Sequence, residues 1–336
     1  MKKLHLNLDS DSYDIIICDG LLSHLSFYVE TVYTKRNIFI ITDSNVSEFY
    51  LEKVTKQLEN KYNVEHVVVK AGEDSKSLKV YEEVVRELFD KNIRRGDLLV
   101  ALGGGVIGDL TGFVSSTIFR GTPYISIPTS LLSMMDSSIG GKTGIDFDGR
   151  KNIIGCFNQP KLVLIDIDTL NTLPTAEYIN GSAELIKHAI IYDEDLFYEL
   201  SKNKTVNEDI ILKSLKVKEH FVVNDVYDEG IRMVLNFGHT FGHIVEVEYG
   251  YRHGEAVALG MLMALDYGID LGISKKSDRL KIQNILKYFG LPTKKYDYKK
   301  YLKLIFEDKK NIAGDLNFIL IDTIGNSVVK VLNENE

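Results

Sequence analysis

The chain has 336 residues. A single hydrophobic core stops growing at about 250 to 300 residues, so this length predicts two lobes. Hydrophobic residues at 44% and charged residues at 26% exclude a disordered or collagen-like chain. The net charge of −8 has the wrong sign for electrostatic binding to nucleic acid or to an anionic membrane.

Two cysteines, Cys18 and Cys156, lie far apart and form no CxxC pair. Neither a disulfide framework nor a thiolate metal site is therefore predicted. The N-terminal lysines are not followed by an apolar run, and no segment approaches the roughly 18 consecutive apolar residues that a membrane span needs. We expect a soluble cytoplasmic protein without nucleic acid or membrane partners.

Short β-branched runs alternate with helical patterns in the first half of the chain. Four runs are apolar and bounded by turn residues, as buried strands are: 37–42, 65–70, 98–102 and 124–128. Between the second and third, apolar residues recur at helical spacing from Val80 to Leu88, with Ser77 as a cap. Strand, helix and strand in sequence predict a parallel sheet with helices on its faces.

The pattern changes after the apolar run that begins at Leu162. From Glu177 to about Phe289 nearly every segment has a helical period. We therefore expect a Rossmann-like α/β domain at 1–158 and a mainly α-helical domain at 159–336, with catalysis in the cleft between them.

A glycine-rich turn follows the run 98–102. Gly103-x-Gly105-x-x-Gly108 matches the GxGxxG pattern of dinucleotide-binding turns, in which backbone N–H groups approach a pyrophosphate. The next strand does not end in the acidic residue that usually binds the ribose, so Asp43 is the substitute. The alternative is a tight turn kept for packing alone.

Two other nucleotide or hydrolase motifs are not supported. Gly140-Gly141-Lys142-Thr143 resembles the end of a P-loop, but position 136, where that motif needs glycine, is Asp136. The chain also has no GxSxG, so it is not predicted to be a serine hydrolase.

Histidines and a glutamate gather in two short segments of the second half. His239 and His243 are four residues apart, and Glu184, Lys187 and His188 share one helical face upstream. One carboxylate and two imidazoles are typical of a catalytic divalent metal with open positions. Spacing alone favours His239 and His243 as the two imidazole ligands. The alternative is that some of these histidines are ordinary buried residues.

Six motifs together resemble the 3-dehydroquinate synthase family of sugar-phosphate cyclases: 102–113, 127–145, 151–152, 181–188, 235–243 and 253–257. The resemblance implies a shikimate-pathway enzyme that converts 3-deoxy-D-arabino-heptulosonate 7-phosphate to 3-dehydroquinate and phosphate. It implies transient oxidation by NAD, phosphate elimination, reduction, ring opening and aldol closure. It also implies a zinc or cobalt ion and a homodimer.

The resemblance also implies individual roles. It assigns the metal to Glu184, His239 and His253, which differs from the pair that spacing favours and leaves His243 for substrate phosphate or proton transfer. NAD contacts are implied for Asp43, Gly72, Glu73, Lys76, Gly104, Gly105, Val106, Asp109, Thr129, Ser130, Lys142, Lys151, Thr169, Thr172 and Glu177. Family members often have aspartate where this chain has Ala71, which puts one cofactor contact in doubt.

The substrate carries a carboxylate and a phosphate, so cationic and polar side chains should surround it. The resemblance nominates Asp136, Lys142, Asn152, Lys187, Lys218, Arg232, Asn236, His243 and Lys310, with Arg120 reaching in from a neighbouring subunit. Rival hypotheses are another cyclase, such as a 2-deoxy-scyllo-inosose synthase, a metal-dependent polyol dehydrogenase, and a pseudoenzyme kept for interaction.

Overall fold

The computed structural model describes residues 1–309 and 316–332. It forms two compact units, Met1–Pro174 with Asn207–Leu212, and Thr175–Val206 with the chain from Lys213 onward. The sequence placed the boundary at 158, which falls before strand β9 (Leu162–Asp166), a central strand of the first unit's sheet. Within the described ranges, no helix is both long and apolar enough to cross a membrane.

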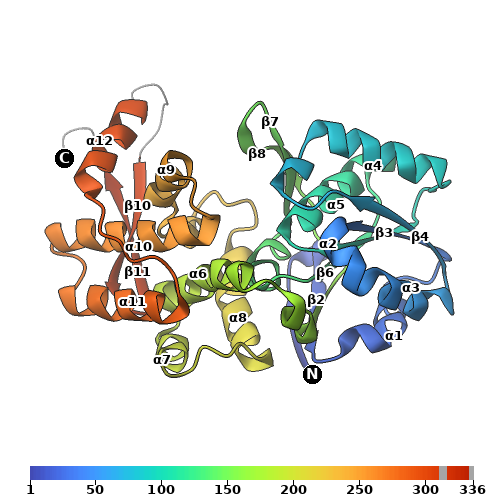
Figure 1. The fold of residues 1–336 in the computed structure, drawn as a ribbon, viewed down its shortest axis with the longest axis horizontal. Coiled ribbons are helices and arrows are strands. Elements are labelled where there is room, and N and C mark those ends of the chain that lie inside the picture. The colour runs from blue at the N-terminus through green and yellow to red at the C-terminus, as the bar shows by residue number, and fades with distance from the viewer. Residues whose placement is uncertain (310–315, 333–336) are drawn as a thin grey trace. The chain divides into compact units, whose positions relative to one another are not determined.

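A seven-stranded sheet forms the centre of the first unit (Figure 1). Its strand order is β1-β2-β9-β6-β5-β3-β4. The strands other than β9 are β1 (Lys2–Leu6), β2 (Tyr13–Cys18), β3 (Asn37–Asp43), β4 (Asn63–Val69), β5 (Leu98–Gly103) and β6 (Tyr124–Pro128). Every neighbouring pair is parallel except β1 with β2. The predicted parallel sheet is confirmed, and β1 and β2 are additions that the sequence had not predicted.

Helices cover both faces of this sheet. One core contains side chains of α1 (Leu25–Glu30) and α3 (Glu52–Glu59), and the other contains side chains of α4 (Leu78–Asp90) and α5 (Gly105–Thr117). A short helix α2 (Ser44–Val46) follows β3. Ser77 caps α4 as predicted, because its Oγ accepts a hydrogen bond from the N–H of Val80 at 3.4 Å.

An antiparallel hairpin of β7 (Lys142–Phe147) and β8 (Arg150–Phe157) completes the first unit (Figure 1). It packs on α5, where a Cβ on Gly112 would lie 2.3 Å from the Thr143 side chain. The sequence had not predicted this hairpin, although it carries Lys142, Lys151 and Asn152.

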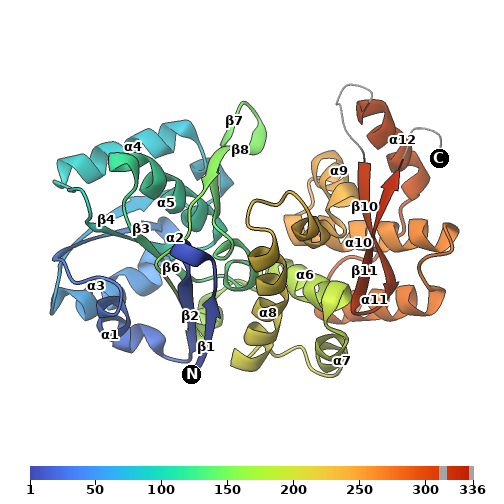
Figure 2. The same ribbon diagram turned by 180° about the vertical axis from the view of Figure 1, so that it is seen from behind.

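The second unit is mainly helical, as predicted (Figure 2). Its helices are α6 (Thr175–Tyr192), α7 (Glu194–Lys202), α8 (Glu208–Asn224, the first residues of which belong to the first unit), α9 (His239–Tyr249), α10 (His253–Asp270), α11 (Lys276–Phe289) and α12 (Tyr298–Lys309). Helix α10 is almost entirely buried and contacts α6, α9, α11 and α12. An antiparallel hairpin, β10 (Leu316–Thr323) with β11 (Asn326–Leu332), was not predicted.

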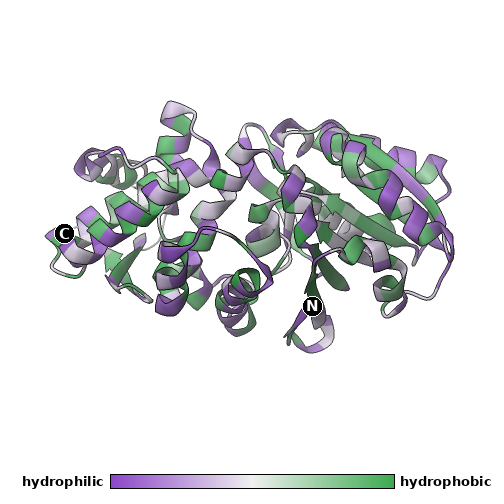
Figure 3. Cartoon of the chain, turned by 60° about the horizontal axis from the view of Figure 1, so that its bottom comes forward, coloured by the Kyte–Doolittle hydropathy of each residue, from purple (hydrophilic) through white to green (hydrophobic). Residues whose placement is uncertain are grey.

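Central strands and outer helices differ in their pattern of hydrophobic and hydrophilic residues (Figure 3). Strands β5, β6 and β9 are buried along their whole length, which explains why they read as continuous apolar runs. Outer helices such as α4 bury only one stripe, including Val84 and Leu88. The Gly-Pro signal at the end of α11 is also confirmed, since Gly290 has a φ of +92° at its C-terminus.

Candidate active site

Three helices of the second unit bring one carboxylate and two imidazoles together. Glu184 lies in the middle of α6, His239 is the first residue of α9, and His253 is the first residue of α10. The Nε2 atoms of His239 and His253 lie 3.5 and 3.6 Å from Oε1 of Glu184. Ligand atoms of the three side chains lie within 4.8 Å of one another, so the group could hold a metal ion.

Glycines let α9 and α10 pack closely enough to bring the histidines together. Gly238 has a φ of +83°, and a Cβ on it would lie 2.9 Å from the carbonyl oxygen of Val257. A Cβ on Gly260 would lie 2.0 Å from the carbonyl oxygen of Gly238. The ring centroids of His239 and His253 are 5.2 Å apart, and a larger residue at either glycine would force the two helices to separate.

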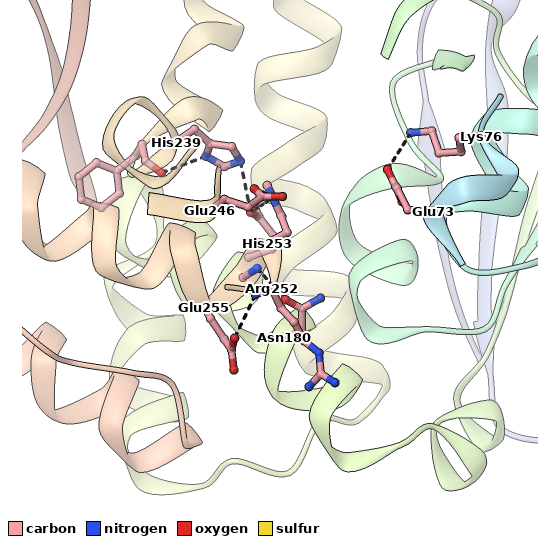
Figure 4. Close-up of polar contacts among 11 residues, drawn as sticks. Glu73, Lys76, Asn180, His239, Glu246, Arg252, His253 and Glu255 are labelled. Carbon is pink, nitrogen blue, oxygen red and sulfur yellow. Dashed lines mark hydrogen bonds and ion pairs between the residues drawn. The ribbon is translucent and has the colours of Figure 1, made fainter. Parts of the chain in front are cut away.

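The second ring nitrogen of each histidine is also held. Nδ1 of His239 lies 3.3 Å from the carbonyl oxygen of Phe237, and Nδ1 of His253 lies 3.3 Å from Oε2 of Glu246. His239, Glu246 and His253 are drawn side by side in Figure 4. A proton on Nδ1 leaves the lone pair of a neutral imidazole on Nε2, which is the nitrogen that faces Glu184.

The Glu184 carboxylate is buried and negatively charged. Burial acts to raise its pKa, but the Lys187 ammonium and the two histidines hold the pKa of Glu184 well below its usual range. Among the described residues, its oxygens make no hydrogen bond and instead face Nζ of Lys187 and the two Nε2 atoms. A buried anion that faces two imidazole nitrogens is suited to share a cation with them.

The pKa values of the two histidines are shifted in opposite directions from the ordinary value. Burial, and then the positive charge of Lys187, lowers the pKa of His239 to about 3. Burial also acts to lower the pKa of His253, but contacts with Glu184 and Glu246 outweigh it and raise this pKa to about 9. His239 is therefore neutral at physiological pH. In the metal-free protein His253 is protonated at this pH, and a bound cation would take the place of that proton.

Helical spacing alone favours His239 with His243 as the two imidazole ligands. Their rings are nearly perpendicular, with centroids 5.4 Å apart, and His243 is exposed. His243 instead joins Glu246 and His253 in a second group whose ligand atoms lie within 4.8 Å of one another. Helical spacing brought the two rings near each other, but the first group is completed by His253 from the next helix.

Lys187 and His188 lie on α6 close to Glu184, as the sequence predicted, and both are buried. Nζ of Lys187 contacts Oε2 of Glu184. Nδ1 of His188 lies 2.8 Å from the hydroxyl of Ser214. The polar side chains on this face of α6 therefore contact other protein groups rather than solvent.

In the first unit, the predicted glycine turn joins β5 to α5. β5 ends at Gly103 and α5 begins at Gly105, so the strand, turn and helix order is confirmed. A Cβ on Gly103 would lie 2.7 Å from the side chain of Ile107, whereas one on Gly108 would meet nothing within 4 Å. Open space beside the first turn of α5 is what an anion needs to approach the N–H groups of a helix start.

Lys76 is buried and connects several of the predicted site residues. Its Nζ donates hydrogen bonds to Oδ2 of Asp109 at 2.7 Å and to Oδ1 of Asn152, and lies 3.8 Å from Oε1 of Glu73. Asn152 has a φ of +55°, and its N–H donates to Oδ1 of Asp146 at 2.7 Å. Burial raises the pKa of Asp109 to about 6, despite the neighbouring ammonium.

Asp43, which the sequence predicts to bind the ribose, lies at the carboxyl end of β3. Its Oδ1 accepts hydrogen bonds from the N–H groups of Asn45 and Val46 at 2.9 and 3.0 Å. At the position where the family often has aspartate, the N–H of Ala71 donates to the hydroxyl of Ser44 at 3.1 Å. The segment after β4 is thereby tied to the segment after β3 without an acidic side chain.

The other predicted NAD residues are spread over both units. Thr169 and Thr172 are joined by Tyr50, whose hydroxyl lies 2.5 Å from the hydroxyl of Thr172 and 3.3 Å from the carbonyl oxygen of Thr169. All but Glu177, which lies on α6, belong to the first unit: Gly72, Gly104, Val106, Thr129, Ser130, Lys142 and Lys151 complete the set.

The predicted substrate residues divide by burial. Lys187, Lys218 and Arg232 are buried in the second unit, whereas Asn236 and His243 are exposed there. Lys142, Asn152 and Arg120 are exposed in the first unit, where Asp136 is half-buried. Lys310 lies outside the described residues.

The carboxylate of Asp225 holds the loop that carries Arg232. Oδ2 of Asp225 accepts hydrogen bonds from the N–H groups of Gly230 and Arg232 at 2.7 and 3.0 Å, and Oδ1 accepts one from Glu229 at 3.0 Å. The guanidinium donates to the carbonyl oxygen of Val226 at 2.7 Å. Burial acts to raise the pKa of Asp225, but these backbone hydrogen bonds hold it below its usual value.

The residues that hold the predicted site residues in position were not predicted from the sequence. Glu246 holds His253, Asp225 holds the Arg232 loop, and Asn180 accepts a hydrogen bond from the N–H of Gly254 beside His253. Glu246 follows His239 by seven residues and so lies on the same helical face, which is the one signal that could have revealed it. For Asn180 and Asp225 the sequence carries no such signal.

Comparison with known proteins finds the same family in both halves of the chain. Residues 66–180 match the family model for the 3-dehydroquinate synthase N-terminal region, and residues 181–311 match the C-terminal one. A 3-dehydroquinate synthase from Clostridium botulinum is 42% identical to this chain. The alignment is 348 residues long, gaps included, and covers 99% of each chain.

Solved structures of related cyclases share the fold. A 2-epi-5-epi-valiolone synthase from Streptomyces hygroscopicus, with NAD⁺ and Zn²⁺ bound, is 26% identical with a TM-score of 0.85, over 96% of this chain and 94% of that one. A 2-deoxy-scyllo-inosose synthase is 21% identical with the same TM-score of 0.85, over 99% and 97% of the two chains. With both halves matched by the family models and a relative of 42% identity along the whole length, the chain belongs to the 3-dehydroquinate synthase family.

Proposed function

We propose that this protein converts 3-deoxy-D-arabino-heptulosonate 7-phosphate to 3-dehydroquinate and phosphate, with NAD and one divalent metal ion as cofactors. Membership of the family supports the reaction. The observation that carries the proposal is the meeting of two imidazole Nε2 atoms at one oxygen of the buried Glu184.

The donor set fits a zinc or cobalt ion. A tetrahedral ion with bonds of about 2.0 to 2.1 Å holds its ligand atoms about 3.3 to 3.4 Å apart. Glu184 Oε1 lies 3.5 and 3.6 Å from the Nε2 atoms of His239 and His253, close to that value. Three protein ligands without cysteine leave a position open, as catalytic sites require. The related valiolone synthase was solved with Zn²⁺ and NAD⁺ bound, which agrees with both cofactors.

The first unit fits NAD. The glycine turn before α5 leaves open space at Gly108, beside N–H groups that suit a pyrophosphate. Asp43 ends β3 with one oxygen capping α2, so the other oxygen can accept hydrogen bonds from ribose hydroxyls. The buried Lys76 pairs with the partly buried Asp109 next to this turn, where the two can orient the nicotinamide end.

Bound NAD would accept and return a hydride, and the bound metal would act as a Lewis acid on the hydroxyl from which that hydride leaves. The side chains of the protein must hold a substrate that has two anionic groups. Lys187, Lys218 and Arg232 are buried cations that suit its carboxylate and phosphate. His243 is exposed and so can reach the phosphate or move a proton. We propose that the leaving phosphate's own oxygens remove the adjacent hydrogen.

A homodimer is part of the proposal. Phe119 and Arg120 both have positive φ, +53° and +61°, and are followed by Gly121 with a φ of +121°. This unusual turn directs the chain so that Arg120 is exposed, and we assign Arg120 to the active site of the neighbouring subunit.

Phosphate release measured together with NADH tests the function. Metal-loaded protein with the heptulosonate phosphate and catalytic NAD should release stoichiometric phosphate and leave no lasting NADH. NADH that accumulates until all of the added NAD is reduced, without phosphate release, would establish a dehydrogenase instead. No phosphate release and no NADH would favour a cyclase for another sugar phosphate. Glu184→Gln should abolish both phosphate release and metal binding, whereas Glu52→Gln, on an exposed glutamate of α3, should change neither.

A further inference from the structure

The ring of His253 lies between two carboxylates from different helices. Its Nε2 is 3.6 Å from Oε1 of Glu184 on α6, and its Nδ1 is 3.3 Å from Oε2 of Glu246 on α9. We propose that Glu246 is a positioning residue that accepts the Nδ1–H of His253 and so fixes the tautomer and ring orientation that present Nε2 to the metal. The inference rests on the proposed function, because it needs the metal at Glu184, His239 and His253.

His253 has the most exposed side chain of the three proposed ligands, 32% against 15% for His239. Glu184 is held in the middle of α6 and is 1% exposed at its side chain, whereas the side chain of His253 is 32% exposed and begins a helix. An imidazole in that position has room to turn and to exchange its two nitrogens. A fixed acceptor at Nδ1 removes that freedom, so less entropy is lost when a metal binds.

His239 has the same arrangement with a different acceptor. Its Nδ1 faces the backbone carbonyl oxygen of Phe237, at the same 3.3 Å that separates Nδ1 of His253 from Glu246. Both histidines thus have an oxygen at Nδ1 and turn Nε2 toward Glu184. A carboxylate partner also makes the imidazole a stronger base, and hence a better ligand, than a carbonyl partner does.

The placement of Glu246 agrees with this role. It lies seven residues after His239 and three after His243, so the three side chains share a face of α9. The Glu246 side chain is only 13% exposed, and burying a carboxylate is costly unless a donor faces it. The next glutamate, Glu248, is exposed and pairs with Lys300 at 3.0 Å.

A rival hypothesis is that Glu246 is itself a ligand. Glu246, His243 and His253 form a group whose ligand atoms could hold an ion, and Nδ1 is the nitrogen of His253 that faces Glu246. A neutral imidazole has one lone pair, so a ring that binds the metal through Nε2 carries its proton on Nδ1 and cannot also bind through that atom. We therefore assign one metal to the chain, with Glu246 as the hydrogen-bond acceptor.

Metal affinity, metal stoichiometry and the absorption spectrum of bound Co²⁺ test the proposal. Glu246→Ala should weaken Zn²⁺ binding by about 10- to 100-fold, measured by chelator competition, and should alter the Co²⁺ spectrum. Glu246→Gln should have a smaller effect, because its amide oxygen still accepts the Nδ1–H. Glu248→Gln and Glu248→Ala are the matched controls and should bind like the wild type. Circular dichroism of the metal-free proteins checks that each variant is folded.

Two outcomes would overturn the inference. One is Zn²⁺ affinity in Glu246→Ala equal to that of Glu248→Ala, with an unchanged Co²⁺ spectrum. The other is two ions per wild-type chain and one per Glu246→Ala chain, which would make Glu246 a ligand of a second ion. The variant Glu184→Gln separates this failure from that of the proposed function. If Glu184→Gln still binds Zn²⁺ normally, the assignment of the metal site is wrong. If Glu184→Gln loses Zn²⁺ but Glu246→Ala binds it normally, only the role assigned to Glu246 is wrong.

Discussion

The N–H of Gly254 donates a hydrogen bond of 2.6 Å to Oδ1 of Asn180, and a Cβ on Gly254 would lie 2.0 Å from the backbone oxygen of Asn180. This contact sets the start of α10 directly against α6 (Figure 4). His253 precedes Gly254, and Glu184 lies one helical turn after Asn180. One close approach therefore determines how the imidazole meets the carboxylate.

Replacing Gly254 by alanine should weaken metal binding. The added methyl must push α10 away from α6, which should lower the free energy of unfolding by about 1 to 3 kcal/mol and the Zn²⁺ affinity at least tenfold. Chelator competition and urea unfolding followed by circular dichroism measure the two effects. Gly108→Ala is the control for a glycine-to-alanine change in a helix with open space. Wild-type Zn²⁺ affinity in Gly254→Ala would show that the contact does not position His253.

Two glycines of the same turn should respond in opposite directions to alanine. A Cβ on Gly103 would press on the Ile107 side chain at 2.7 Å, so Gly103→Ala should lower the free energy of unfolding by about 1 to 3 kcal/mol. A Cβ on Gly108 meets nothing within 4 Å, so Gly108→Ala should raise it by about 0.5 to 1 kcal/mol in the NAD-free protein. Urea unfolding without NAD measures both, and an equal loss at the two positions would contradict the open space at Gly108.

Asp109 should make stability depend on pH. Its pKa is raised from 3.8 to about 6, mainly by burial. The folded protein therefore keeps a proton that the unfolded chain has released, and this stabilisation is complete below pH 3.8 and is lost as the pH rises through 6. Asp109→Asn lacks that titration. The free energy of unfolding of the wild type minus that of the variant should thus fall by about 2 to 3 kcal/mol between about pH 4 and pH 7.

Urea unfolding of both proteins without NAD, at several pH values, checks this prediction. The ionic strength should be constant, because the Asp109 to Lys76 pair keeps some contact with solvent. A difference that does not change with pH would mean that Lys76 cancels the cost of burying the Asp109 carboxylate.

Asp225→Asn should impair substrate binding through Arg232. An amide retains one acceptor oxygen, so the loop loses hydrogen bonds to the N–H groups of Gly230 and Arg232 or to that of Glu229. A misplaced guanidinium should raise the KM for the heptulosonate phosphate by about tenfold or more, with NAD affinity unchanged. Steady-state kinetics and NAD titration measure these quantities, with Asp9→Asn, on an exposed residue of the first unit, as the control. An unchanged KM would remove Arg232 from the substrate site.

The interior of the fold could be predicted because its signals are local. Strands β3, β5 and β6 are buried on both faces, so each is a short apolar run, and Ser77 is a standard cap. The hairpins β7–β8 and β10–β11 were missed. In β8 most side chains are exposed, so no apolar run marks the strand. Their pairing depends on contacts that lie outside each strand, and a single strand's residues do not reveal its partner.

Only some residues of the candidate site could be predicted from local sequence patterns. Glu184, His239 and Lys187 were found from residue types and helical spacing, since neighbours on one helix face are determined by the helical repeat. The same rule selected His243 as a partner of His239 and missed Glu246, which shares that face. The place of His253 beside Glu184 came from the family resemblance, because α6 and α10 are far apart in sequence.

The sequence by itself determined the chemistry available to this protein: its α/β and helical halves, the glycine turn, the acidic and imidazole side chains, and the family to which the chain belongs. The tertiary structure alone decided which atoms face one another. Nε2 of His253 turns to Glu184 and Nδ1 to Glu246 because Gly254 lies against Asn180 and the glycines of α9 and α10 allow close packing. Such contacts depend on the separation of whole helices, and no local pattern of residues specifies that distance.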